Sequence, residues 1–273
     1  MADLLSDPVM QSSVAPFFAA LIVAGAMLPL RLAGLAAAAG FLATVFLVGN
    51  FALSPLTATR KIVLLGMGAT LIGVLAGLAF RPNRSTGLVL GAVFGSASIW
   101  AFWSVLVQKP VPEALVYGAG IAALVMWLVA FTVSLHADPV RAGAAGLALG
   151  LGSGVAAVLG ASALIGQYGL GLGAACGAFL LLVMILGRRV AAGTVLTLTA
   201  SVLGALLGAG AMMLEQLPWT SLAALASIPV LVRLPLGASS PAWVQAIVAS
   251  IYGLAGAGAA CSFAWLASRG SAG

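Results

Sequence analysis

Charged residues are scarce in this chain. They make up 6% of the 273 residues, whereas 63% are hydrophobic, and the mean hydropathy is +1.23. Soluble domains carry about 25% charged residues, so this composition excludes a soluble fold. Because a bilayer core about 30 Å thick needs roughly 20 apolar residues per helix, the composition predicts an all-α, polytopic integral membrane protein. We expect residues 1–273 to form a single transmembrane domain without a soluble domain.

Side chains that usually carry chemistry are also few. The one histidine, His136, lies in a connection, which excludes a histidine-rich metal site and a haem held by two histidines of one chain. Cys176 and Cys261 lie in apolar segments and are interpreted as small buried hydrophobic residues. No acidic residue falls in the middle of a predicted span, which disfavours proton relays and catalysis by paired carboxylates. We therefore predict no metal, no cofactor and no enzymatic activity.

Basic residues outnumber acidic ones by eleven to five, but they are scattered between apolar runs. Without a basic patch, nucleic acid is excluded as a partner, and the lipid bilayer is the expected one. Seven basic residues fall on one side of the predicted spans and four on the other, so the first side is predicted to be cytoplasmic. The seven are Arg31, Arg81, Arg84, Arg141, Arg188, Arg189 and Arg233. The expected location is a prokaryotic-type inner (plasma) membrane.

Apolar runs broken by charge, proline or polar clusters predict ten transmembrane spans. Their ranges are 14–30, 33–52, 62–80, 86–107, 114–135, 141–163, 167–187, 191–214, 219–236 and 241–267. The ninth span is short and contains Pro229, so a broken or re-entrant helix is the alternative there. Ten spans invite a five-plus-five division, whose halves would be inverted relative to each other as in many transporters.

Glycine is abundant, with 35 residues, and several glycines recur every four residues. In two predicted spans this spacing places them on one helix face, where two backbones can approach closely within a bilayer. The predicted helix-packing residues are Gly146, Gly150, Gly154, Gly169, Gly173 and Gly177. We expect spans six and seven to form a tight hairpin joined by a turn around Gly166-Gln167-Tyr168.

Arg233 stands among apolar residues in the stretch IPVLVRLPLG. The first interpretation of Arg233, and of Arg31 after the first span, is a cation that anchors a helix end at the membrane surface. The alternative is that Arg233 lines a cavity and meets an anionic group of a substrate. Thr194, Thr197 and Ser201 share one helix face near the start of the eighth span, where they either line a polar path or bond a neighbouring helix. Arg233 and these three hydroxyls form the predicted substrate-binding set.

Two functions remain open from the sequence. The first is transport or facilitated passage of a small hydrophobic or amphipathic solute, favoured by the span count, the glycine packing and the ninth span. In length and ten-helix topology the chain is similar to the drug and metabolite transporters, with no motif residues to carry over. The second is a non-catalytic structural or assembly subunit of a larger membrane complex, which needs only small and apolar packing surfaces.

These two functions predict different partners and different interiors. A transporter would act alone or as a homo-oligomer, whereas a subunit would bind other membrane proteins. Convergence of Arg233 with Thr194, Thr197 and Ser201 on one internal cavity would favour transport. A dry interior, with a broad glycine-rich face toward lipid, would favour the subunit.

Overall fold

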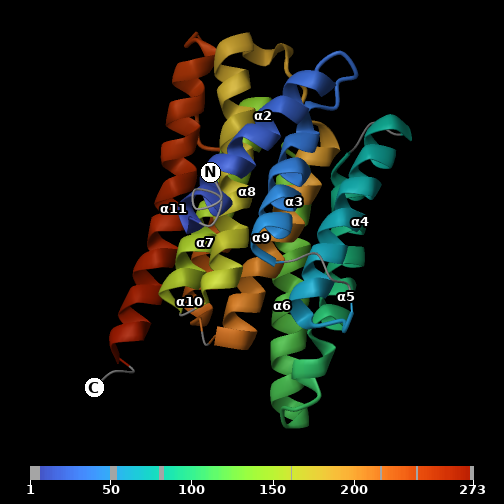
Figure 1. Ribbon diagram of the computed structural model, residues 1–273, viewed down its shortest axis with the longest axis vertical. Coiled ribbons are helices and arrows are strands. Elements are labelled where there is room, and N and C mark those ends of the chain that lie inside the picture. The colour runs from blue at the N-terminus through green and yellow to red at the C-terminus, as the bar shows by residue number, and fades with distance from the viewer. Residues whose placement is uncertain are drawn as a thin grey trace.

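A computed structural model describes residues 7–49, 54–79, 83–160, 162–215, 217–237 and 239–270 (Figure 1). Within these ranges the chain is almost entirely helical and has no strand. The α-helices are α2 (Ala15–Met27), α3 (Ala36–Gly49), α4 (Ala58–Ala79), α5 (Arg84–Leu106), α6 (Val111–Val133), α7 (Pro139–Leu159), α8 (Ala163–Leu186), α9 (Gly193–Glu215), α10 (Trp219–Leu231) and α11 (Ala242–Gly270). Short helical turns lie at η1 (Met10–Val14), η2 (Ala33–Leu35) and η3 (Gly187–Arg189).

These ten α-helices correspond in order to the ten predicted spans, but the count of full-length spans is lower. Among the described residues, eight helices are long and apolar enough to cross a membrane. The two shorter ones are α3, with an apolar helical stretch over Ala33–Val48, and α10. At about 1.5 Å per residue, the 13 residues of α10 extend only about 20 Å, less than the bilayer core of about 30 Å.

Prolines explain the short length of α10. Pro218 precedes the helix and Pro229 lies inside its last turn, while Pro235 follows in the connection. Proline lacks a backbone N–H and disfavours helical geometry in the residue before it. The helix therefore ends at Leu231, and the predicted ninth span loses its last five residues to a turn and a loop.

The turn between α7 and α8 lies earlier than predicted. It falls between Leu159 and Ala163, where Gly160 ends α7 and Ser162 precedes α8. Gly166 instead belongs to the first turn of α8 and faces α7, because a Cβ atom there would be 2.3 Å from Cγ2 of Val158. The prediction of a turn around residues 166–168 was therefore wrong: this glycine packs two helices together and does not end one.

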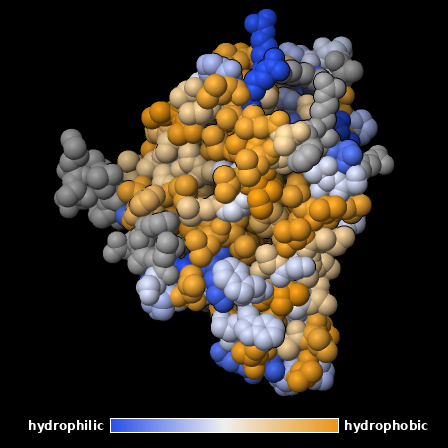
Figure 2. Space-filling model, turned by 90° about the vertical axis from the view of Figure 1, so that its right-hand side faces the viewer, coloured by the Kyte–Doolittle hydropathy of each residue, from blue (hydrophilic) through white to orange (hydrophobic). Residues whose placement is uncertain are grey.

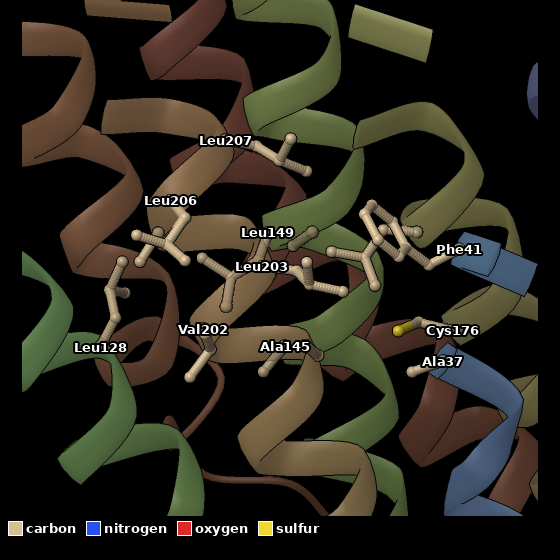
Figure 3. Packing of buried hydrophobic residues seen from close by; sticks show 14 of the residues in the cluster. Ala37, Phe41, Leu128, Ala145, Leu149, Cys176, Val202, Leu203, Leu206 and Leu207 are labelled. Atoms are coloured by element: carbon tan, nitrogen blue, oxygen red, sulfur yellow. The ribbon is translucent and has the colours of Figure 1, made fainter. Parts of the chain in front are cut away.

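Helix α9 occupies the centre of the bundle (Figure 1). Every residue from 194 to 212 is buried, and α9 packs against α4, α6, α7 and α8. Figure 3 shows Leu203 and Leu206 of α9 in one cluster with Leu149 of α7 and Leu128 of α6. Because lipid tails are as apolar as leucine, this packing depends on van der Waals contact. The other helices are arranged around this core.

Apolar side chains cover the outside of the bundle. Figure 2 shows a broad apolar band on one face, with hydrophilic residues toward its two ends. Leu71 and Leu75 of α4 and Val93 of α5 are each more than half exposed. Together with eight helices that are long enough to span, this surface identifies a multi-pass integral membrane protein in contact with a lipid bilayer.

The basic residues separate toward the two ends of the bundle. Arg31 follows α2, Arg141 begins α7 and Arg233 follows α10 at one end; Lys61 begins α4 and Lys109 follows α5 at the other. These are the two groups that the charge count distinguished. The assignment of the arginine-rich end to the cytoplasm stays a prediction.

The two halves of the chain correspond in part. In each half the first helix packs against the second and the fourth against the fifth, and the contacts of α3 with α8 and of α4 with α9 join the halves. However, α7 also packs extensively against α9 and α11, and α2 has no comparable contact with α4 or α6 among the described residues. The five-plus-five division stays a prediction.

Candidate functional site

Glycines join α7 to α8 with almost no side chain between the two backbones. A Cβ atom at Gly150 would be 2.3 Å from the backbone nitrogen of Gly173, and one at Gly154 would be 2.6 Å from the nitrogen of Leu170. A Cβ atom at Gly169 would be 2.4 Å from Cα of Gly154. No side chain larger than hydrogen fits at these positions without separating the helices.

Two other glycines of the predicted packing set have different surroundings. Gly146 faces Cys176, whose Sγ atom would be 2.6 Å from an added Cβ atom. The nearest atom to an added Cβ at Gly177 is Cδ1 of Leu147 at 3.5 Å, which is an ordinary van der Waals distance. Gly177 therefore lies at the edge of the α7–α8 contact, where there is room for a side chain.

The predicted hydroxyl stripe of α9 lies inside the bundle. Thr194, Thr197 and Ser201 are 1%, 0% and 0% exposed. The Thr197 hydroxyl donates to the carbonyl oxygen of Gly193 at 3.2 Å, and the Ser201 hydroxyl donates to that of Leu198 at 3.1 Å. Oγ1 of Thr194 is buried without a hydrogen-bond partner in the described part of the chain. None of the three residues lines the cavities described below, whereas Arg233 lines one of them.

A neighbouring hydroxyl of α9 makes the contact between helices. Oγ1 of Thr199 lies 3.1 Å from Oγ1 of Thr70 on α4. Because the Thr70 hydroxyl donates to the carbonyl oxygen of Gly66 at 2.9 Å, Thr199 is the donor of the bond between the helices. Such bonds in membrane proteins contribute about 0.6 kcal/mol on average. Thr199 is not part of the predicted stripe of Thr194, Thr197 and Ser201.

Arg233 connects the end of α10 to the end of α6. Its Nη2 atom donates to the backbone carbonyl of Phe131 at 3.0 Å and to the hydroxyl of Ser134. Its guanidinium carbon lies 4.7 Å from the centre of the Phe131 ring. The last carbonyls of a helix have no partner within the helix ladder; that of Phe131 accepts from the Ser134 hydroxyl at 2.7 Å and from Arg233 as well. This half-buried arginine therefore has a structural role besides any contact with lipid or ligand.

A cleft of about 850 Å³ opens beside Arg233. It lies between the starts of α5 and α7 and the ends of α6 and α10. Its apolar lining residues are Leu88, Ala130, Phe131, Leu135 and Ala137, and its polar lining residues are Asn83, Ser134, His136, Asp138, Arg141 and Arg233. Two arginines and one aspartate are the charged groups of this lining, so the cleft has a net positive charge.

Arg141 presents hydrogen-bond donors to this cleft. Asp138 caps α7 by accepting from the backbone nitrogens of Val140 at 3.1 Å and Arg141 at 3.3 Å, and its Oδ2 atom lies 3.3 Å from Nε of Arg141. Nη1 of Arg141 donates to the carbonyl oxygen of Arg233 at 2.9 Å. Nη2 makes no hydrogen bond within the described ranges, and the side chain is 24% exposed. One face of this guanidinium is therefore available to a ligand.

The sequence treated Arg141 only as a basic residue of a connection. A detectable signal was the run Asp138-Pro139-Val140-Arg141, in which an N-cap aspartate and a proline at the first helical position precede an arginine that pairs with the aspartate. The proximity of Arg233, 92 residues further along the chain, could not be read from this run.

Arg31 lies at the same end of the bundle but does not line the cleft. It is exposed, in the turn after α2, and its φ of 59° places it in the left-handed region that residues other than glycine seldom occupy. Its backbone nitrogen donates to the carbonyl oxygen of Leu28 at 3.0 Å. Leu28 and Pro29 line a separate cavity of about 500 Å³ with Arg189 of η3.

A comparison with protein-family models, curated proteins and solved structures finds no match to this chain. Its function is therefore inferred from its own geometry. Its main features are a helical bundle with an apolar exterior, a central helix that is buried from residue 194 to residue 212, and a cationic cleft at one end. They describe a multi-pass membrane protein with a cationic cleft at one end.

Proposed function

We propose that the protein transports, or facilitates the passage of, a small amphipathic anion that enters through the cleft beside Arg141 and Arg233. The observation that carries this proposal is Nη2 of Arg141, which lines the cleft and has no hydrogen-bond partner in the described part of the structure. A guanidinium group suits carboxylate, sulfonate and phosphate oxygens, because its planar donors match their geometry. The net positive charge of the lining favours the same class of solute.

The remaining walls suit an apolar body. Leu88 is about half exposed and lines the cleft with Ala130, Phe131 and Leu135. Binding sites for small molecules are mostly apolar, with a few polar groups that orient the ligand, and have volumes of about 300–1,000 Å³. The cleft, at about 850 Å³, fits a solute with one acidic group on a short apolar body.

Helix α10 is the element expected to move during passage. It packs closely on glycines of α11: a Cβ atom at Gly256 would be 2.9 Å from Cγ1 of Ile228, and one at Gly253 would be 3.2 Å from Cγ1 of Val232. Small residues at such a contact leave few side chains to interlock, and interrupted helices beside a substrate site are common in transporters. A movement of α10 would also move Arg233, which follows α10, lines the cleft and donates a hydrogen bond to the end of α6.

Uptake of benzenesulfonate into proteoliposomes tests the proposal. This anion is charged at every accessible pH and crosses lipid poorly, so saturable uptake requires the protein. We expect Arg141→Gln to lower the uptake rate at low solute concentration by about tenfold to a hundredfold, because a hydrogen bond to a charged group contributes about 1.5–3 kcal/mol and each 1.4 kcal/mol is tenfold.

The matched control is Arg269→Gln, which removes one arginine near the C-terminal end of α11, where the side chain stacks on Trp265 with a distance of 3.9 Å to the ring centre. This variant should transport at the rate of the unchanged protein. Size-exclusion profiles must show that both variants are folded. An absence of saturable uptake by the unchanged protein, or equal rates in Arg141→Gln and Arg269→Gln, would contradict transport through this cleft.

A second candidate function is a non-catalytic subunit of a larger membrane complex. It is favoured by the hydroxyl groups of Thr194, Thr197 and Ser201, which face no described cavity. Mass spectrometry of the natively purified assembly separates the two functions. Membrane proteins that copurify at a fixed stoichiometry would support the subunit, whereas a monomer or a homo-oligomer would support transport.

A further inference from the structure

An apolar groove lies on the outside of the bundle between α2, α8 and α11. Part of α7 lines it. Figure 1 shows α11 alongside α7, with α2 crossing in front of α8. The groove has a volume of about 460 Å³ and almost entirely apolar walls, which include Phe17 of α2, Leu181 and Met184 of α8, and Ile251 and Leu254 of α11. Its volume lies within the range of about 300–1,000 Å³ that ligand sites have.

The absence of a side chain at Gly177 forms part of this groove. Gly177 lines the groove on α8, and Leu147 of α7 lies at its base. Because an added Cβ at Gly177 would have only ordinary contact with Leu147 at 3.5 Å, this glycine is not required for close helix packing. Its effect is to keep the groove open.

The groove leads to a second cavity at the end of the bundle. Leu181 and Met184 line the groove, and Ile185 and Leu186 line the second cavity of about 500 Å³. Residues 181 and 185 are one helical turn apart on the same side of α8, so the two cavities follow one another along this helix. An acyl chain in the groove would therefore emerge at the end of α8, where the membrane surface lies.

Positive charge gathers where the second cavity opens. Arg189 lines this cavity and is exposed. Arg31 is exposed two residues after Pro29, which lines the same cavity from the other side. Basic pockets between transmembrane helices at the membrane surface bind the phosphate groups of anionic lipids. The arginines thus lie where the headgroup of a phospholipid would be, and the apolar groove lies where its acyl chain would be.

We propose that the α2–α8–α11 groove is a binding site for one anionic phospholipid, with an acyl chain between these helices and its phosphate group beside Arg189 and Arg31. The surrounding bilayer contains this ligand. A groove with such apolar walls would be unfavourable if water filled it. A transmembrane helix of another protein would cover the apolar walls but would leave the two arginines without an anionic partner. The site is separate from the cleft of Arg141, so it does not depend on the proposed transport.

Native mass spectrometry of protein extracted from nanodiscs tests the site, with equal amounts of phosphatidylglycerol and phosphatidylcholine offered as probes. We expect one retained phosphatidylglycerol per chain. The double variant Arg31→Gln/Arg189→Gln should lower its retention by about thirtyfold, because each arginine near an anionic surface contributes about a fivefold preference and the two factors multiply. Gly177→Leu, which fills the groove without a backbone clash, should lower retention of both lipids.

The matched control is Arg60→Gln/Arg269→Gln, which removes the same two charges at the other end of the bundle. Its retention of phosphatidylglycerol should equal that of the unchanged protein. The proposal is overturned if the two double variants lose the lipid equally, if phosphatidylcholine is retained as well as phosphatidylglycerol, or if a copurifying membrane protein is released by Gly177→Leu. Thermal unfolding of each variant in detergent shows that it is folded, so loss of lipid is not loss of structure.

Discussion

Replacing Gly169 with alanine is expected to separate α7 from α8 and to lower the free energy of unfolding by about 3 kcal/mol or more. The added methyl carbon would lie 2.4 Å from Cα and 2.5 Å from the backbone nitrogen of Gly154, and 3.0 Å from the carbonyl oxygen of Gly150. These neighbours are backbone atoms, so no side-chain rotation relieves the clash. The helices must move apart along a contact that lipid tails cannot fill as closely.

The size of this effect is measured by unfolding in mixed micelles, followed by circular dichroism. Gly68→Ala on α4 is the matched control, since an added Cβ there has no neighbour within 4 Å. Alanine is favoured over glycine in a helix by about 1 kcal/mol, so the control should be as stable as the unchanged protein or slightly more stable. Equal stability of Gly169→Ala and Gly68→Ala would show that the backbones of α7 and α8 are further apart than in this structure.

Replacing Leu203 with alanine is expected to destabilise the protein by about 3 kcal/mol. Leu203 of α9 is 0% exposed, and its Cδ2 atom occupies the notch left by Gly66 of α4, 2.5 Å from where a Cβ of that glycine would stand. Removing the side chain leaves a closed cavity between α4 and α9, because no lipid tail reaches the centre of the bundle. The lost van der Waals contacts are therefore not replaced.

The same substitution at Leu71 supplies the comparison. Leu71 belongs to α4 but is 62% exposed, so a lipid tail fills the space that Leu71→Ala leaves, and the expected change is below about 0.5 kcal/mol. Both variants are unfolded in the same mixed micelles. A similar destabilisation by both would mean that Leu71 faces another protein surface, and a small effect at Leu203 would place α9 outside the core.

Local composition was enough to predict most of the helices. The hairpin of α5 and α6 was expected over 86–107 and 114–135 and is found over Arg84–Leu106 and Val111–Val133. Its ends are marked by Asn83, which caps α5 in a reciprocal capping box with Thr86, and by Pro110 before α6. Such signals act through neighbouring residues in the chain and are therefore visible in the sequence.

Two boundaries were harder for a physical reason. Gly166 was interpreted as part of a turn, yet the same residue type permits either a turn or close packing of two helices. The short extent of α10 depends on whether Pro229 ends the helix or only bends it. In each case the outcome depends on the neighbour that the residue meets, which is far away in the sequence.

The candidate site shows the same division between local and distant information. The sequence singled out Arg233 because a cation among apolar residues is conspicuous at any position. It could not associate Arg233 with Arg141, Ser134 and Phe131, because these contacts join segments about a hundred residues apart. The Thr194 stripe was selected by its helical spacing, but spacing does not tell which neighbour that face meets.

The sequence established that this chain is a helical integral membrane protein. It also indicated roughly where the helices begin and end, and which connections lie at the same end of the bundle. These properties follow from the apolar content of each segment and from the charge between segments. The three-dimensional structure was needed to place α9 at the centre, to leave the cleft and the groove open, and to assign each glycine its neighbour. In a bilayer both the core and the lipid-facing surface are apolar, so polarity along the chain does not distinguish inside from outside.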